Sequence, residues 1–315
     1  MLRLFFVSDV HGSERCFRKF VNAAKFYSVN VVILGGDLTG KAIVPILRTS
    51  DGTFTYEYMG EKTTLKNEES LKSVCAMLSD KGYYPYVTNN EEIVELQADK
   101  AKLRDLFLNL MKERLRSWVR FAEERLKGSN VQCFISPGND DPFEIDEALS
   151  ESETVTNPEN KVVTLGSKYE MITLGYTNPT PWNSPREVSE DELAKMVSRL
   201  TDSVRNMEHC IFNFHCPPYN TKLDEAPMLT KDLKPVFSGG DLRLQHVGSK
   251  AIRKAIEYYQ PLLGLHGHIH ESRAMEKIGR TVCLNPGSQY QSGILNGAIV
   301  QIDNGKIKNY MFTSG

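Results

Sequence analysis

Short apolar runs alternate along the chain with segments that have helical periodicity. Leu2–Val7 is apolar, Ser13–Tyr27 has apolar residues at three- and four-residue spacing, and Val31–Leu34 is apolar again. Strands that alternate with helices are typical of layered α/β folds. Further strand-like runs lie at Val131–Ile135, Glu170–Leu174, Cys210–Phe214, Leu262–Leu265, Thr281–Leu284 and Ala298–Ile302. We therefore predict an α/β fold for the chain.

Residues 41–130 interrupt this alternation. Ile43–Arg48 and Thr53–Tyr58 flank an Asp-Gly turn and predict a β-hairpin. Helical segments are expected at Glu68–Ser79 and from about Ala98 to Lys127. We interpret the apolar stripe of the second helix as packing on the core, with a cap over a site or a dimer face as the alternatives. The segment is predicted to be an insertion, made of a hairpin and long helices, within one domain.

Seven side chains suited to bind metal ions lie in five short clusters, nearly all of which follow an apolar run. They are Asp9 and His11 in Ser-Asp-Val-His-Gly, Asp37 in Gly-Gly-Asp-Leu, Asn139 in Pro-Gly-Asn-Asp-Asp, His215 in Phe-His-Cys-Pro-Pro, and His268 and His270 in Gly-His-Ile-His. Side chains at strand ends meet at one edge of an α/β sheet. Four imidazoles, two carboxylates and one amide exceed the needs of one tetrahedral ion and suit two ions that share a carboxylate.

Single members of this set have simpler explanations. Asp9 could cap the helix that follows it, Asp37 could be a turn residue, and His215 could be a hydrogen-bonded buried histidine. All of these explanations would have to hold at once, whereas one binuclear metal site explains the whole set. We therefore favour the binuclear site.

The clusters resemble, in order, the motifs of the calcineurin-like metallophosphoesterase superfamily: Asp-x-His, Gly-Asp, Gly-Asn-His-Asp/Glu, a lone His, and Gly-His-x-His. The turn Asn285-Pro-Gly-Ser288 matches another segment that the family often carries. The departure is at Asp140, where the family pattern has histidine. The resemblance implies a four-layer α/β/β/α sandwich of two mixed sheets, to which the hairpin and helical insertion would be added.

The resemblance also divides the candidate ligands between two ions: Asp9, His11 and His270 at the first, Asn139, His215 and His268 at the second, and Asp37 between them. His266 alternates with His268 and His270, so an extended segment would face all three the same way. The Gly-His-x-His match selects His268 and His270, and His266 with His268 is the alternative pair. Amide and imidazole ligands suit two divalent ions such as manganese, which we expect, or iron, zinc, nickel or cobalt.

Two such ions can share a hydroxide that attacks phosphorus, which predicts a metal-dependent phosphoester hydrolase. Asn139 could also donate its amide hydrogens to a phosphoryl oxygen. Asp140 could act as a general acid only if its pKa were raised considerably. Asp141 matches the acidic position of the motif and is expected to orient His11 or a loop backbone. A carboxylate at position 140 would repel a dianionic monoester more than a monoanionic diester, so we favour phosphodiester substrates.

Composition limits the remaining classes of function. The chain has 315 residues, 40% of them hydrophobic, and is predicted to form a single domain over residues 1–315. No apolar run approaches the roughly 20 residues that span a membrane, so we expect a cytoplasmic protein acting on a small phosphoester. A net charge of −2 argues against tight binding of nucleic acid. The alternatives are a metal-dependent nuclease on DNA or RNA and a weakly active scaffold that retains the fold. Homo-oligomerisation is left open.

Overall fold

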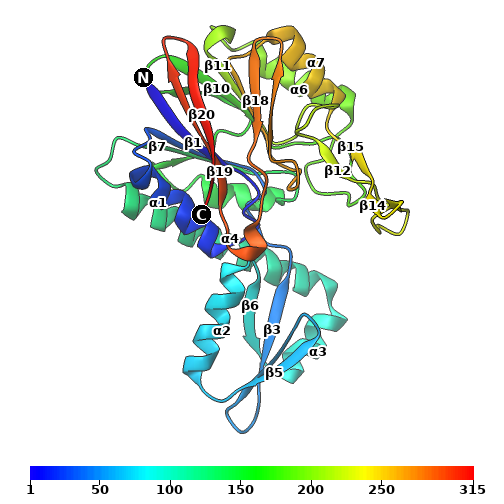
Figure 1. Ribbon diagram of the computed structural model, residues 1–315. Coiled ribbons are helices and arrows are strands. Elements are labelled where there is room, and N and C mark those ends of the chain that lie inside the picture. Colours follow the sequence, from blue (N-terminus) through cyan, green and yellow to red (C-terminus); the bar gives the residue numbers. More distant parts are fainter.

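Two six-stranded β-sheets form the centre of the computed structural model, which describes residues 1–315 (Figure 1). The first, called sheet 1, has the spatial order β20 (Lys306–Ser314), β19 (Asn296–Asp303), β1 (Leu2–Val7), β2 (Val31–Gly35), β7 (Gln132–Ser136) and β8 (Val155–Thr156). Sheet 2 has the order β17 (Ala274–Ile278), β18 (Thr281–Asn285), β16 (Leu263–Leu265), β11 (Cys210–Phe214), β10 (Tyr169–Leu174) and β9 (Val162–Leu165). Both sheets are mixed, because each joins four parallel strands to antiparallel neighbours.

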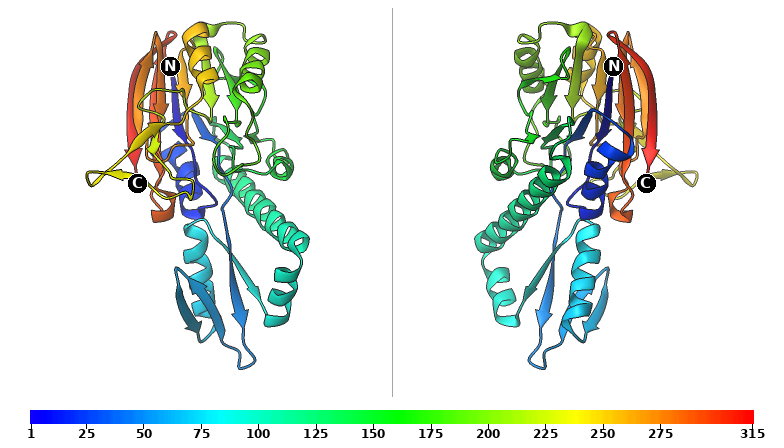
Figure 2. Two further views of the ribbon diagram at one scale, coloured as in Figure 1. Left: turned by 90° about the vertical axis from the view of Figure 1, so that its right-hand side faces the viewer. Right: turned by 90° about the vertical axis from the view of Figure 1, so that its left-hand side faces the viewer.

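The two sheets pack against each other, and helices cover their outer faces (Figure 2). Sheet 1 is covered by α1 (Glu14–Phe26), α4 (Lys100–Leu126) and the short α5 (Asp146–Leu149). Sheet 2 is covered by α6 (Glu190–Thr201) and α7 (Lys250–Tyr259). The predicted four-layer α/β/β/α sandwich of two mixed sheets is therefore confirmed.

The apolar run of β1 illustrates why these strands are buried on both faces. Leu4 and Phe6 belong to the core between the sheets, whereas Phe5 and Val7 belong to the core beneath the helices. Side chains alternate along a strand, so a strand with apolar neighbours on both faces reads as a continuous apolar run. The remaining predicted strands of the two sheets are present with end points within two residues of those expected.

Residues 41–130 leave sheet 1 after β2 and return to it at β7. They form a separate four-stranded sheet in the order β5 (Glu61–Leu65), β4 (Phe54–Tyr58), β3 (Ile43–Arg48) and β6 (Tyr84–Thr88), packed with α2 (Glu68–Asp80) and α3 (Asn90–Ala98). Six buried apolar residues give this part its own core: Val44, Ile46, Phe54, Leu65, Leu71 and Leu78. The insertion extends below the sandwich in Figure 1. The expected hairpin is β3–β4, and β5 and β6 enlarge it into a sheet.

A turn of the insertion lies in close backbone contact with the main body. Gly82, between α2 and β6, lies against Gly12 and Gly40, and a Cβ atom at Gly40 would overlap the Gly82 carbonyl oxygen. A Cβ atom at Gly82 would in turn overlap the carbonyl oxygen of His11. This contact places the insertion directly beside the loop that carries a candidate ligand.

The long helix α4 joins the insertion to the sandwich. Trp118 stacks on Phe17 of α1 with 4.2 Å between ring centroids, and its indole nitrogen donates a hydrogen bond to Glu14. Met111, Leu115, Val119, Ala122 and Leu126 are also buried in the core beneath sheet 1. The apolar stripe thus packs on the core, in line with the interpretation favoured from the sequence. Neither α4 nor any other helix is long and apolar enough to cross a membrane.

A second, smaller projection interrupts the region between β11 and α7. The strands β12 (Glu225–Pro227) and β15 (Leu244–His246) form its base, and β13 (Phe237–Ser238) and β14 (Asp241–Leu242) form its tip. This arm extends to the right of the sandwich in Figure 1. Its short strands carry no long apolar run, and its sheet pairing was not predicted from the sequence.

Candidate metal centre

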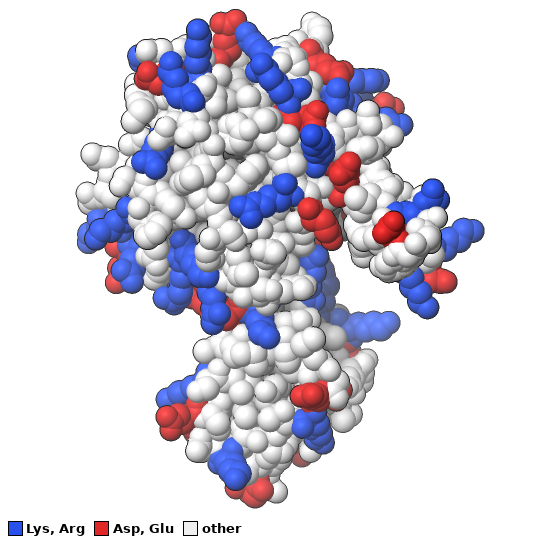
Figure 3. All heavy atoms as spheres, in the orientation of Figure 1, with Lys and Arg blue, Asp and Glu red and all other residues white.

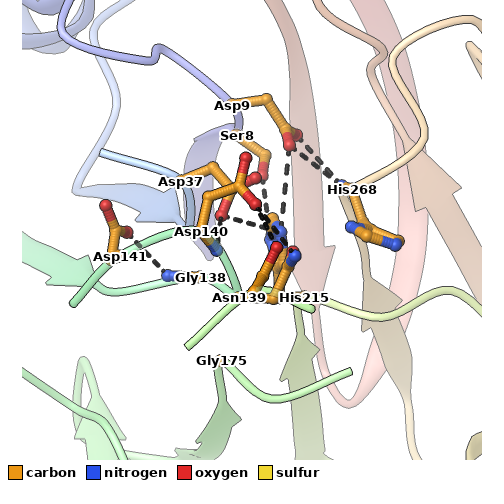
Figure 4. Close-up of polar contacts among 12 residues, drawn as sticks. Ser8, Asp9, Asp37, Gly138, Asn139, Asp140, Asp141, Gly175, His215 and His268 are labelled. Atoms are coloured by element: carbon orange, nitrogen blue, oxygen red, sulfur yellow. Dashed lines mark hydrogen bonds and ion pairs between the residues drawn. The ribbon is translucent and has the colours of Figure 1, made fainter. Parts of the chain in front are cut away.

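The carboxyl ends of the parallel strands bring the predicted ligands together at one end of the sandwich. Asp9 and His11 follow β1, Asp37 follows β2, Asn139 follows β7, His215 follows β11, and His268 and His270 follow β16. Figure 4 shows residues from both sheets converging on one small region. Five of the seven ligand candidates are buried, and His268 and His270 are partly buried.

The ligand candidates form two adjacent groups. Asp9, His11 and His270 place one ligand atom each within 4.8 Å of one another, and Asp37, His215 and His268 do the same. Asp37 lies between the groups, with Oδ2 3.6 Å from Nε2 of His11 and Oδ1 3.4 Å from Nε2 of His215. This is the division that the resemblance implies.

Several buried polar atoms in the centre have no partner within the protein. Oδ1 of Asn139 and Nε2 of His215 are buried without a hydrogen bond. Nδ1 of His215 lies 3.0 Å from the carbonyl oxygen of Gly35, so it must donate, and the lone pair of the neutral ring is on Nε2. Nε2 of His11 and Nε2 of His270 lie only 3.0 Å apart. Unpaired buried acceptors are costly, and a cation between them would satisfy them, so these residues fit a pair of divalent ions.

The electrostatics of the centre also favour a cation. Burial lowers the pKa of His268 to about 3, with a further contribution from His215, so His268 is neutral at pH 7 and can bind metal. Burial opposes the charged form of His215, but Asp37 and Asp9 outweigh it and raise the pKa of His215 to about 10. The negative charge of the two carboxylates thus favours a positive charge at this point, either a proton on His215 or a bound cation. A divalent ion would compete with that proton.

Four of the candidate ligands have strained backbone conformations. The φ angles are 58° at Asp9, 40° at His11, 51° at Asp37 and 67° at His268. Residues other than glycine rarely adopt this left-handed region, and each instance costs on the order of 1–3 kcal/mol. The His11 amide donates to the carbonyl oxygen of Asp37 at 2.9 Å, and the His268 amide donates to the Asp9 carboxylate at 3.1 Å. These bonds hold the strained turns in place.

The Asn285–Ser288 turn supports the ligands from behind. Nδ2 of Asn285 donates to the carbonyl oxygens of Gly267 (3.3 Å) and Ile269 (3.0 Å), which flank His268. Oγ of Ser288 donates to the carbonyl oxygen of Asp9 at 2.6 Å. A Cβ atom at position 267 would overlap the side chain of Ser8, so glycine is required there. The turn therefore fixes both the Gly-His-x-His segment and the Asp9 loop.

Asp141 points away from the other acidic side chains in Figure 4 and binds backbone instead. Its carboxylate accepts hydrogen bonds from the amides of Gly138 (2.8 Å), Leu38 (2.9 Å) and Thr39 (2.8 Å), and from Oγ1 of Thr39 (2.7 Å). Of its two expected partners, His11 and a loop backbone, the structure shows the loop backbone. Asp141 thus ties the loop of Asp37 to the loop of Asn139.

Asp140 does not meet the condition set for a general acid. Burial alone would raise the pKa of Asp140, but Lys41 and a hydrogen bond from Ser184 outweigh it and lower the pKa to about 2. Nζ of Lys41 lies 2.7 Å from Oδ2 of Asp140, and Oγ of Ser184 lies 2.6 Å from Oδ1. Asp140 is therefore a carboxylate at neutral pH and holds no proton that it could deliver to a leaving group.

His266 is not part of either ligand group. It is fully buried, and Nδ1 donates to the carbonyl oxygens of Phe214 (2.9 Å) and Cys216 (3.0 Å). Its Nε2 atom faces Gly264, where a Cβ atom would lie 2.7 Å away. The structure therefore groups His268 with Asp37 and His215, and His270 with Asp9 and His11, and the alternative pair of His266 with His268 is not found.

Two residues beside the centre were not predicted from the sequence. Lys41 pairs with Asp140, and the ring of Tyr290 lies 4.7 Å from the ring of His11 and 6.0 Å from the ring of His270. Lys41 lies in the same loop as Asp37, and Tyr290 closely follows Ser288. Their nearness to motif residues was the one sequence feature that could have pointed to them.

Comparisons with known proteins place this geometry in context. No protein-family model matches the sequence. The uncharacterized protein MJ1162 of Methanocaldococcus jannaschii is 36% identical over 158 residues, which make up 50% of this chain and 64% of that relative. The match therefore spans less than two thirds of the relative's length.

Solved structures resemble the whole chain. The crystal structure of TT1561 of Thermus thermophilus aligns with 100% of this chain and 98% of its own, with 13% sequence identity and a TM-score of 0.56. A dimetal phosphatase from Danio rerio aligns with 99% of this chain and 98% of its own, with 10% identity and a lower TM-score of 0.44. The similarity to TT1561 over the whole chain shows a shared fold, with two mixed sheets between helical layers.

Proposed function

We propose that this chain is a metal-dependent hydrolase of phosphoesters. The observation that carries the proposal is the pair of adjacent ligand groups with Asp37 between them, and the unpartnered atoms of Asn139 and His215 beside it. Such a set has the composition of a binuclear centre rather than of a structural zinc site, because it contains no thiolate. We propose two divalent ions, with manganese as the preferred metal.

The residues of the chain provide positioning rather than a nucleophile. Two divalent ions, when bound, would activate a water molecule and neutralise charge on the phosphoryl oxygens. Cys216 adjoins His215, but burial raises the pKa of its thiol to about 12, so it is not a reactive thiolate. Nδ2 of Asn139 lies 3.2 Å from Oδ1 of Asp140 and can donate to a substrate oxygen instead. The ring of Tyr290 packs against the ring of His11, with 4.7 Å between the ring centroids.

Phosphodiesters remain the substrate class that we propose. The Asp140 carboxylate repels a dianionic monoester more strongly than a monoanionic diester. Lys41 offsets part of that repulsion, because its ammonium group forms an ion pair with Asp140. The preference for diesters is therefore expected to be moderate, and monoesters are expected to be hydrolysed as well.

Small substrates fit the surface charge better than nucleic acid does. Lys and Arg side chains are interspersed with Asp and Glu side chains over the face shown in Figure 3. A nuclease would need a continuous basic surface to bind the phosphate backbone. The net charge of −2 points the same way.

A metal-reconstitution assay tests the proposal. The protein would be stripped with a chelator, reloaded with manganese, and assayed with bis-p-nitrophenyl phosphate and p-nitrophenyl phosphate, with Asp37→Asn as the control. We expect metal-dependent hydrolysis that falls at least about a hundredfold in Asp37→Asn, because loss of a ligand should cost no less than loss of a partner behind a ligand, which costs about 10- to 100-fold. Metal binding without turnover of either ester would favour a scaffold. Cleavage of DNA or RNA that weakens steeply with salt would favour a nuclease.

A further inference from the structure

The Lys41–Asp140 ion pair stands at the edge of the metal centre, at the position where the family motif has histidine. Nζ of Lys41 lies 2.7 Å from Oδ2 of Asp140, with the lysine side chain 55% exposed and the aspartate side chain 23% exposed. The pair is therefore reachable from solvent, whereas Asp9, Asp37 and His215 behind it are buried.

Asp140 adjoins the ligand that lies between the two groups. Its backbone amide donates to Oδ1 of Asp37 at 3.0 Å. Its carboxylate also joins His11 and Asp37 in a third set of ligand-type atoms within 4.8 Å of one another. A phosphoester bound to both ions would therefore lie beside Asp140, and the charge of Lys41 would act on the same phosphoryl group.

Neighbouring contacts fix the backbone next to Lys41 and the carboxylate of Asp140. The amide of Gly40 donates to the hydroxyl of Tyr84 at 3.1 Å, and Gly40 lies against Gly82 of the insertion. Oδ1 of Asp140 accepts from Oγ of Ser184 at 2.6 Å, which leaves Oδ2 directed at Lys41. The lysine side chain is 55% exposed, so it has room to shift from Asp140 to a phosphoryl oxygen.

We propose that the Lys41–Asp140 ion pair determines which charge state of a phosphoester the centre accepts. Lys41 acts as the specificity residue, and Asp140 positions it and offsets its charge. With both present, Lys41 offsets most of the negative charge of Asp140, so monoanionic diesters are moderately preferred and dianionic monoesters are also admitted. Loss of Lys41 leaves a carboxylate that repels dianions, and loss of the Asp140 charge leaves an ammonium that attracts them. This inference rests on the proposed phosphoesterase function.

Charge substitutions at the two positions test the inference in opposite directions. Lys41→Met, Asp140→Asn and the double variant would be compared with Lys102→Met, a matched control that removes an exposed lysine paired with Glu95 on the insertion side. Each manganese-loaded protein would be assayed for kcat and KM with the mono- and diester. Metal content and calorimetric binding of inorganic phosphate would be measured at about pH 8, where phosphate is mainly a dianion.

For Lys41→Met we expect phosphate affinity to fall about tenfold. The ratio of kcat/KM for the monoester to kcat/KM for the diester should fall by about the same factor, mainly because KM for the monoester rises. One unit charge about 6 Å away at intermediate dielectric accounts for that factor. Asp140→Asn is expected to raise both quantities, and the double variant and Lys102→Met to remain near wild type. If both single variants keep their metal, their monoester-to-diester ratio of kcat/KM and their phosphate affinity, the inference is overturned. The proposed function would be unaffected by that result. A different outcome is also possible: the wild type hydrolyses neither ester, but the two single variants shift phosphate affinity in opposite directions. That result would overturn the proposed function and support the inference.

Discussion

Asp37, Asp140 and Asp141 are close together in space, yet each has a different chemical role. Asp37 lies between two groups of ligands, Asp140 pairs with Lys41, and Asp141 binds only backbone and Thr39. The residue types of the ligand set could be predicted from the sequence, since the motifs themselves name them. Lys41 could not, because its partner is 99 positions away and no local pattern links the two. The left-handed φ angles of the ligands were equally hidden, since they arise from tertiary hydrogen bonds.

At Asp141 we predict a large loss of stability on substitution. Asp141→Ala would leave the amides of Gly138, Leu38 and Thr39 buried without an acceptor. Unsatisfied buried donors cost about 1–3 kcal/mol each, so we expect the free energy of unfolding of the metal-free protein to fall by about 3 kcal/mol or more. Urea denaturation would measure it, with the exposed Glu68→Ala as the control. A loss below about 1 kcal/mol would contradict this account.

At Glu159 we predict that the free energy of unfolding depends on pH. Its carboxylate accepts from the amide of Gly175 at 2.9 Å, and burial raises its pKa from 4.5 to about 8. The folded protein therefore binds this proton more strongly than the unfolded chain does. The contribution of Glu159 to stability is complete below about pH 4.5 and is lost as the pH rises to about 8.

Glu159→Gln should remove that part of the pH dependence, because glutamine accepts the same hydrogen bond and does not titrate. Denaturation midpoints measured across this range should fall less steeply in Glu159→Gln than in the wild type. Parallel curves for the two proteins would show that Glu159 is already ionised in the folded state.

At the scale of the elements, burial decides what a sequence reveals. β1, β2, β7 and β11 are apolar on both faces and were predicted closely. β5 has the sequence Glu-Lys-Thr-Thr-Leu, with only Leu65 buried, so no apolar pattern marks it. β6 was missed because its buried residues are only Tyr84 and Thr88. Exposed edge strands of this kind form through pairing with a neighbour, which composition does not encode.

Trp118 is the residue at which we expect the attachment of α4 to be most sensitive. Trp118→Ala would remove the stack on Phe17 and the hydrogen bond to Glu14. Such large-to-small changes in a core cost about 3–5 kcal/mol, and we expect a loss of that size in chemical denaturation. Phe107→Ala on the same helix, which is only partly buried, provides the comparison and should cost less. Equal losses at the two positions would argue against this packing model.

For the molecule as a whole, the proposed ions should stabilise the fold. The ligands come from loops after strands of both sheets, so ions bound there would connect the two halves of the sandwich. Ligand binding to the folded state at about a hundred times the dissociation constant adds about 2.7 kcal/mol. We expect manganese to raise the melting temperature of the metal-free wild type and to have a much smaller effect on Asp37→Asn. An equal rise in both proteins would place the binding elsewhere.

The layered architecture of the molecule was predictable because alternating strands and helices allow few arrangements, and the motif resemblance named one of them. The projections were harder to predict. The insertion was recognised by the break in alternation, whereas the arm between β11 and α7 has strands of two or three residues and no distinctive pattern. Short strands gain their stability from tertiary contacts, so local sequence says little about them.

The contact of Gly82 with Gly12 and Gly40 determines which positions of the insertion can accept substitutions. Any side chain at these three positions would push the insertion away from the backbone of His11. The strands of the insertion farther from this junction are free of that constraint, because they touch neither His11 nor its loop. Substitutions on the outer surface of the insertion should therefore leave the metal centre undisturbed. A tilt of the whole insertion should instead shift the backbone of His11, because Gly82 packs directly against it.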